Sequence, residues 1–212
     1  LNTLSDSVDR DSDGLADMGK DLQDRARTAM SSLGVTYPEL SGYYPQPKGL
    51  LFPAFLSVQN LSGIYSPFTI EANYNSAMVS YNLPFTICHE LSHLRGFMQE
   101  EEANFIGFLA CVSTDYTAFN YSGYLLGWIY ATNELYETDY DTFEEVYSRL
   151  SDNVKADLSA NSSFWNRYDS KVAEVSGQIN DHYLKANGQS DGVKSYDRMV
   201  DLMITWFRIL RR

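Results

Sequence analysis

The spacing of apolar residues changes twice along this chain. In the N-terminal stretch apolar side chains recur every three or four positions, which predicts one long surface helix over residues 6–32. From Gly63 to Tyr81 strand-forming residues stand on both sides of Asn73-Tyr74-Asn75-Ser76. This pattern predicts a β-hairpin over 63–81 that turns at those four residues.

Helical spacing returns after the hairpin. It predicts helices within 83–114 and then over 122–137, 141–150, 152–185 and 193–211, with a break at Asn187-Gly188-Gln189-Ser190. The fold class that follows is mainly α (α+β), a single domain over 1–212 in which a small hairpin or sheet adjoins the helices.

Composition limits the class of protein. With 212 residues, 44% of them hydrophobic, the chain is long enough for one core. It has no run of eighteen apolar residues that would span a membrane, and its net charge of -12 argues against nucleic acid as a partner. The polar start at Leu1 carries no signal peptide, so we expect an excised domain or mature fragment. Cys88 and Cys111 lie in apolar surroundings, which favours buried thiols over a disulfide.

An acidic run near the N-terminus resembles the beginning of a calcium-binding loop. Asp9, Asp11, Asp13 and Gly14 match its first positions, but Lys20 stands at the twelfth, where such a loop needs a bidentate glutamate. We therefore expect the acidic start of a helix here, with a bound cation as the alternative.

Two histidines and a glutamate stand out in the segment that begins at Pro84. On a helix His89 and His93 lie one above the other, while Glu90 points about 100° round the axis. This is the H-E-x-x-H pattern of zinc sites, with two nitrogen ligands and a carboxylate that can take a proton from a zinc-activated water. The alternative, histidines bonded only to backbone, would bury two imidazoles and a carboxylate at high cost. The pattern predicts a zincin-like domain.

A catalytic zinc needs a third protein ligand. Gly96 predicts a turn directly after the helix. The metzincin pattern H-E-x-x-H-x-x-G-x-x-H would place its last histidine at position 99, which holds Gln99. The glutamate-zincin pattern fits better, because Glu100 is followed at the right offsets by Ala103 and Asn104, and this asparagine shares its helix face.

Glu100 is therefore the expected third ligand. Glu101, Glu102 and His182 stay open as alternatives, and negative charge at a helix N-terminus accounts for acidic residues here without any metal.

Several segments resemble the bacterial domain-of-unknown-function family 3810, and the resemblance covers nearly all of the chain beyond about residue 36. They are Gly63–Asn73, Leu83–Thr86, His89–Phe97, Glu100–Phe105, Tyr121–Tyr124, Tyr183–Gln189 and Gly192–Tyr196. The resemblance implies a zinc metallopeptidase whose parent protein is anchored in a bacterial cell membrane by N-terminal helices absent here. It also implies that the soluble domain faces outward, and it names no substrate.

The chemistry we expect is zinc-dependent hydrolysis of peptide bonds in a peptide or protein substrate, with Glu90 as the general base. The hairpin over 63–81 leads directly into the H-E-x-x-H segment, so we expect its edge to pair with the extended substrate. The developing oxyanion needs a further donor. Tyr196 is the first candidate, followed by Arg198 and His182, although a tyrosine more often serves only to pack the core.

Two other functions remain open. A non-catalytic binding or sensor domain could hold a structural zinc, for which Cys88 is the nearest fourth ligand, but on a helix it points about 100° away from His89. A zinc amidase acting on cell-wall peptides would use the same residues. An exchangeable water on the metal would distinguish a peptidase from a binding or sensor domain. A substrate screen would distinguish a peptidase from an amidase.

Overall fold

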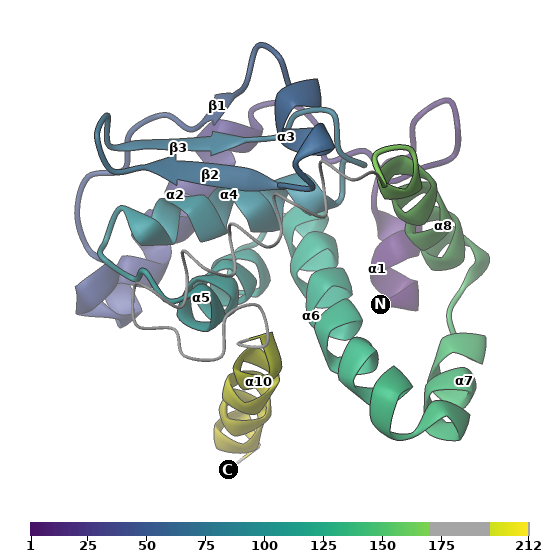
Figure 1. Cartoon of the computed structure of the whole chain (residues 1–212). Coiled ribbons are helices and arrows are strands. Elements are labelled where there is room, and N and C mark those ends of the chain that lie inside the picture. The colour runs from purple at the N-terminus through teal and green to yellow at the C-terminus, as the bar shows by residue number, and fades with distance from the viewer. Residues whose placement is uncertain (170–195, 212) are drawn as a thin grey trace.

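The computed structural model describes residues 1–169 and 196–211. In these residues the protein is mainly helical with a small three-stranded sheet, so the predicted fold class is confirmed (Figure 1). The helices are α1 (Asn2–Ser7), α2 (Leu22–Thr36), the 3-10 helix η1 (Pro38–Leu40), α3 (Ala54–Val58), α4 (Asn82–His93), α5 (Glu100–Val112), α6 (Thr117–Thr138), α7 (Tyr140–Ser148), α8 (Asp152–Asn166) and α10 (Tyr196–Leu210). The strands are β1 (Lys48–Gly49), β2 (Gly63–Ser66) and β3 (Glu71–Tyr74).

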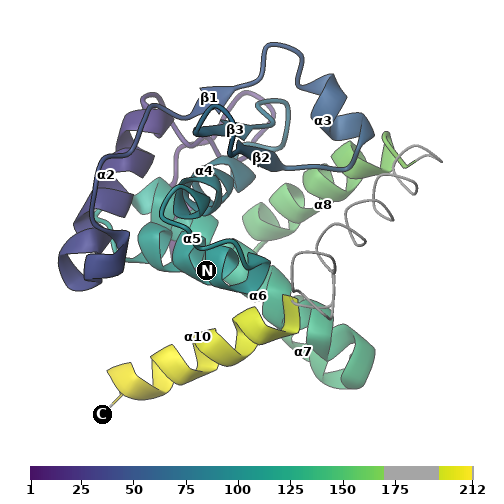
Figure 2. The same ribbon diagram turned by 60° about the vertical axis from the view of Figure 1, so that its left-hand side comes forward.

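Helix α4 occupies the centre of the molecule. It packs against α2, α5 and α6 and against both β2 and β3, so that the sheet covers one side of α4 and helices cover the rest (Figures 1 and 2). Ile87, Cys88 and Leu91 on α4 are completely buried, because every side of this helix has a neighbour. A helix in this position holds its polar side chains in a fixed environment.

The sheet has the order β1-β3-β2, which leaves β2 at an edge. β2 runs antiparallel to β3, with Gly63 opposite Tyr74 and Ser66 opposite Glu71. The hairpin is therefore present, but its predicted turn is wrong. The chain turns at residues 67–70, and Asn73 and Tyr74 lie inside β3. The residues expected to form the second strand up to Tyr81 instead lead into α4.

The predicted helix over 6–32 is also wrong. α1 ends at Ser7 and α2 begins at Leu22, and residues 8–21 between them form a loop in which Gly14 and Gly19 have φ of 77° and 75°. These left-handed conformations interrupt a helix and suit glycine. The apolar spacing was misleading because Met18 is buried from a loop. The acidic residues lie in this loop, so they do not start a helix.

The later helices agree better with the prediction. α5, α7 and α10 lie within a few residues of the expected bounds, while α6 begins five residues earlier, at Thr117. The helix expected over 152–185 ends at Asn166, and its part from residue 170 onward lies outside the described residues. Cys88 and Cys111 are buried free thiols, as expected. None of the described helices combines the length and apolar character needed to cross a bilayer.

Candidate metal centre

Two consecutive helices, α4 and α5, form the site. They approach closely at Gly107, where a Cβ atom would lie 3.2 Å from the carbonyl oxygen of Phe85 and 3.3 Å from the amide nitrogen of His89. Glu100, Asn104 and Gly107 follow one another at helical spacing, so they share one face of α5. The close contact at Gly107 therefore brings that face against the histidines of α4.

Three donor atoms converge between these helices. The Nε2 atoms of His89 and His93 lie 3.2 Å apart. Oε2 of Glu100 is 3.2 Å from Nε2 of His89, and Oε1 of Glu100 is 3.8 Å from Nε2 of His93. Donors of a tetrahedral zinc with bonds of about 2.0–2.1 Å lie about 3.3 Å apart. The spacing of the three side chains fits this ion.

Hydrogen bonds orient both imidazoles. Nδ1 of His93 lies 2.7 Å from the carbonyl oxygen of Phe97, so it donates its proton there and leaves the Nε2 lone pair to face the other donors. Asn104, on the face of α5 that meets α4, raises the pKa of His89, and the hydroxyl of Tyr130 donates to Oδ1 of Asn104 over 3.3 Å. Such outer partners fix the orientation of metal-binding histidines.

The charges in the cluster favour protonation of one imidazole, that of His89, over protonation of both. Burial lowers the pKa of His89, but the hydrogen bond and charge of Glu100 outweigh it and raise that pKa to about 9. Burial and the charge of His89 lower the pKa of His93 to about 4. Burial also acts on Glu100, but the hydrogen bond from His89 holds the pKa of this carboxyl below its ordinary value. A metal cation would take the place of the proton on His89.

Glu90 lies beside the three donors and not among them. Its Oε1 is 4.0 Å from Nε2 of His89, and the residue is 4% exposed. Burial raises the pKa of Glu90 to about 8, since the charge of Glu100 adds to the effect of burial while His89 opposes it. A carboxyl group with a pKa near neutrality can both accept and return a proton.

Strand β2 lies directly over Glu90. A Cβ atom on Gly63 would lie 2.8 Å from both Cγ and Cδ of Glu90, so only glycine fits without displacing the carboxylate. Two positions along the strand, the ring of Tyr65 lies 6.0 Å from the imidazole of His93, between centroids. The face of β2 that carries these two residues is the face that meets the site.

No strand among the described residues pairs with the outer edge of β2, and this edge offers backbone groups at the same two residues. The amide of Asn75 donates to the carbonyl of Ser62 over 2.8 Å, which makes this a hydrogen-bonded pair of the antiparallel ladder. Bonded pairs alternate, so the amides and carbonyls of Gly63 and Tyr65 point away from β3. An extended chain can pair with them there.

The other candidate residues lie elsewhere. Glu101 is buried and bound to Arg198, whose Nη1 is 3.0 Å from its Oε1, and Glu102 is exposed. Among the residues that the structure describes, Cys88 does not join the three donors. Tyr196 is the first residue of α10, but its side chain lies outside the described part, and so does all of His182. Tyr196 as the oxyanion donor stays a prediction.

Sequence reasoning missed four contributors to this site. The hairpin was expected to bind substrate beside the H-E-x-x-H helix, but its pattern did not single out Gly63 and Tyr65 as the residues that lie over Glu90 and His93. Phe97 acts through its backbone carbonyl, so its side chain carries no signal. Tyr130 reaches Asn104 from α6, and only a three-dimensional contact reveals it.

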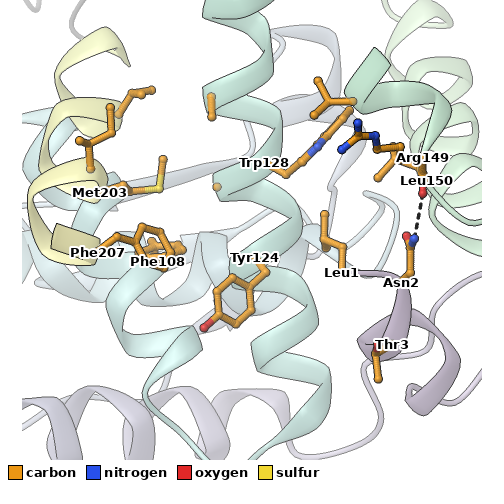
Figure 3. A pocket seen from close by; sticks show the side chains of 15 residues that line it. Leu1, Asn2, Thr3, Phe108, Tyr124, Trp128, Arg149, Leu150, Met203 and Phe207 are labelled. Atoms are coloured by element: carbon orange, nitrogen blue, oxygen red, sulfur yellow. Dashed lines mark hydrogen bonds between the residues drawn. The ribbon is translucent and has the colours of Figure 1, made fainter. Parts of the chain in front are cut away.

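A separate concavity lies apart from the metal-site residues. An apolar pocket of about 640 Å³ opens between α1, α6, α7 and α10, and Tyr124, Trp128, Met203 and Phe207 contribute to its walls (Figure 3). Neither the two histidines nor the site glutamates line it. Among the residues that the structure describes, the cluster of possible metal ligands lies on α4 and α5, away from this pocket.

The comparisons with known proteins give a family and no activity. A family model described as "Protein of unknown function (DUF3810)" matches residues 1–204. No curated protein and no solved structure matches the chain.

Proposed function

The chain belongs to this family of unknown function, and from the geometry of its site we propose that it is a zinc-dependent metallopeptidase. One observation supports the proposal most strongly. Three donor atoms converge at distances that suit zinc, while the carboxylate of Glu90 lies next to them without being one of them. This arrangement separates metal binding from proton transfer, as hydrolysis by an activated water requires.

Metal binding, proton transfer and substrate binding fall to different residues. His89, His93 and Glu100 would hold the zinc, which supplies Lewis-acid activation of a water molecule and of the scissile carbonyl. Glu90 takes the proton from the attacking water and passes it to the leaving amine. Gly63 and Tyr65 present backbone groups that pair with an extended substrate and hold its peptide bond over Glu90.

The number of donors also bears on the choice between catalysis and structure. Structural zinc sites close with four protein ligands, whereas catalytic sites keep one position open. In the part of the chain that the structure describes, the cluster has three donors. This favours a catalytic zinc over the structural zinc of a binding domain.

The test is the substitution Glu90→Gln, with Glu102→Gln as the matched control on an exposed carboxylate. Glu90→Gln should keep about one zinc per chain and lose about 10²–10⁴-fold in the rate of hydrolysis of a quenched fluorescent peptide library. Glu102→Gln should keep both properties. If Glu90→Gln loses its zinc, the division of roles is wrong, and if the zinc-loaded wild-type chain cleaves no peptide, the proposed activity is wrong.

A further inference from the structure

The segment that contains the sheet is almost free of charge. Between Glu39 and Glu90 only Lys48 and Glu71 carry charged side chains, and these two form an ion pair with each other. The whole chain has 28 acidic and 16 basic residues, so its net charge of -12 resides elsewhere. The molecule therefore presents one neutral surface on an otherwise acidic body.

The neutral surface carries large apolar side chains that are exposed to solvent. We define the apolar rim as Leu51, Phe52, Phe55, Ile64, Phe68 and Ile70, which are between 46% and 97% exposed. Ile70 adopts a left-handed φ of 55°, which is unfavourable for a β-branched residue. Exposed apolar side chains gathered in this way are typical of binding surfaces.

The two halves of the rim lie at opposite ends of the sheet. β1, which precedes Leu51, pairs with the end of β3 that lies opposite Gly63, so Leu51, Phe52 and Phe55 belong to this end of the sheet. Phe68 and Ile70 lie in the turn at the other end, after Ser66. Figure 1 shows α3 at one end of the sheet and this turn at the other, with α4 beneath β2. The two halves of the rim are thus separated by roughly 10 Å of strand.

We propose that the apolar rim selects the substrate, and that the substrate class is uncharged polypeptide segments with apolar side chains on both sides of the scissile bond. This inference rests on the proposed peptidase function. A chain paired with Gly63 and Tyr65 extends toward both ends of the sheet, where the two halves of the rim offer apolar surface to its flanking side chains. A charged side chain there would lose water without gaining an ionic partner, and an acidic one would also be repelled by the body of the protein.

The experiment compares decapeptides that differ only in their flanking residues, which are leucine and phenylalanine, glutamate, or lysine. Two zinc-loaded variants remove one half of the rim each, Leu51→Ser with Phe52→Ser, and Phe68→Ser with Ile70→Asn. Val35→Ser is the control, because Val35 on α2 is 84% exposed and lies outside the rim. Hydrolysis is measured on the wild-type background, and binding is measured by fluorescence anisotropy on the Glu90→Gln background.

We expect the wild-type chain to prefer the apolar peptides over the charged ones by about tenfold or more in kcat/KM, and each rim variant to lose most of this preference. Val35→Ser should retain it. Apolar peptides that bind through the rim but are never cleaved would support the inference and overturn the peptidase. Cleavage without preference, or with a preference for charged peptides, would overturn the inference alone. So would rim variants that lose binding to phosphatidylcholine vesicles while their peptide binding is unchanged.

Discussion

The N-terminal loop and the α4–α5 pair both carry metal-binding residue types at regular spacing, and they use them differently. In the loop, the carboxylate of Asp11 accepts hydrogen bonds from the amides of Asp13 and Leu15, each over 2.9 Å, and Asp17 accepts one from Gly19. In the pair, the side chains of His89, His93 and Glu100 turn toward one another. Residue spacing in the sequence therefore does not suffice to predict a metal site. Carboxylates in a loop can accept hydrogen bonds from the neighbouring backbone, whereas the faces of two packed helices hold donors together.

The first way to break this comparison is His93→Ala. This removes one of the converging nitrogen donors, so zinc affinity should fall by more than the about 10–100-fold that losing an outer partner costs. Isothermal titration with zinc measures the effect, and circular dichroism checks that the helices remain. Asp13→Ala in the loop should bind zinc like the wild type, and an equal loss in both variants would contradict the distinction.

The next prediction concerns the carboxylate donor Glu100, and its neighbour Glu101 provides the control. Glu100→Gln should weaken zinc binding by at least about tenfold, since a neutral amide is a poor ligand. Glu101→Gln should leave zinc affinity close to that of the wild type, because the Glu101 carboxylate binds Arg198. If Glu101→Gln has the larger effect in the same titration, the third donor has been misassigned.

The pH dependence sharpens the comparison further. The pKa of His89 is raised to about 9, so a proton competes with zinc throughout the neutral range. Zinc affinity should rise by about tenfold per pH unit between pH 7 and 9, whereas a histidine with an ordinary pKa of about 6.5 would give a plateau above pH 7. Competition with a fluorescent chelator across this range measures the slope. A flat profile would show that His89 is neutral before zinc binds.

Of these variants, Asp157→Asn should have the smallest effect on zinc affinity. It should have a large effect on the stability of the fold. Asp157 on α8 is fully buried and accepts hydrogen bonds from Arg10, from the amide of Ala16 and from Tyr121, over 2.8, 2.9 and 2.5 Å. It holds the N-terminal loop against α6 and α8. Removing its charge should lower the free energy of unfolding by about 3–5 kcal/mol, because the Arg10 charge loses its buried partner. Urea unfolding measures this loss, and unchanged zinc affinity would confirm that the loop serves the fold.

The sequence predicted the clustering of His89, His93 and Glu100 better than the elements around them. Helical periodicity alone relates His89 to His93 and Glu100 to Asn104, and a glycine turn between two short helices leaves few ways to arrange them. The position of Glu90 beside the donors follows from the same geometry. These local relations hold whatever the rest of the chain does.

The segments that the sequence predicted wrongly depend on contacts between residues that are distant in sequence. Asn75 does begin a turn, in which its Oδ1 accepts from the amide of Ala77, but this turn leads into α4 and does not join two strands. Its side-chain amide donates to Ser57 Oγ and its backbone amide donates to Ser62 beside the sheet. Met18 has the spacing of a helix, but Asp157, distant in sequence, holds the loop that buries it. The local sequence does not reveal the distant residue whose contact decides the conformation of each segment.

The short sequence distance between the donors also bears on how the protein assembles. His89 and Glu100 are eleven positions apart, while Gly63 precedes Glu90 by twenty-seven positions and joins it only after the sheet has formed. Contacts of low sequence separation need little loop closure and form early in folding. If the proposed function holds, we expect the α4–α5 hairpin to bind zinc before β2 packs against it, so that metal binding precedes the assembly of the substrate edge.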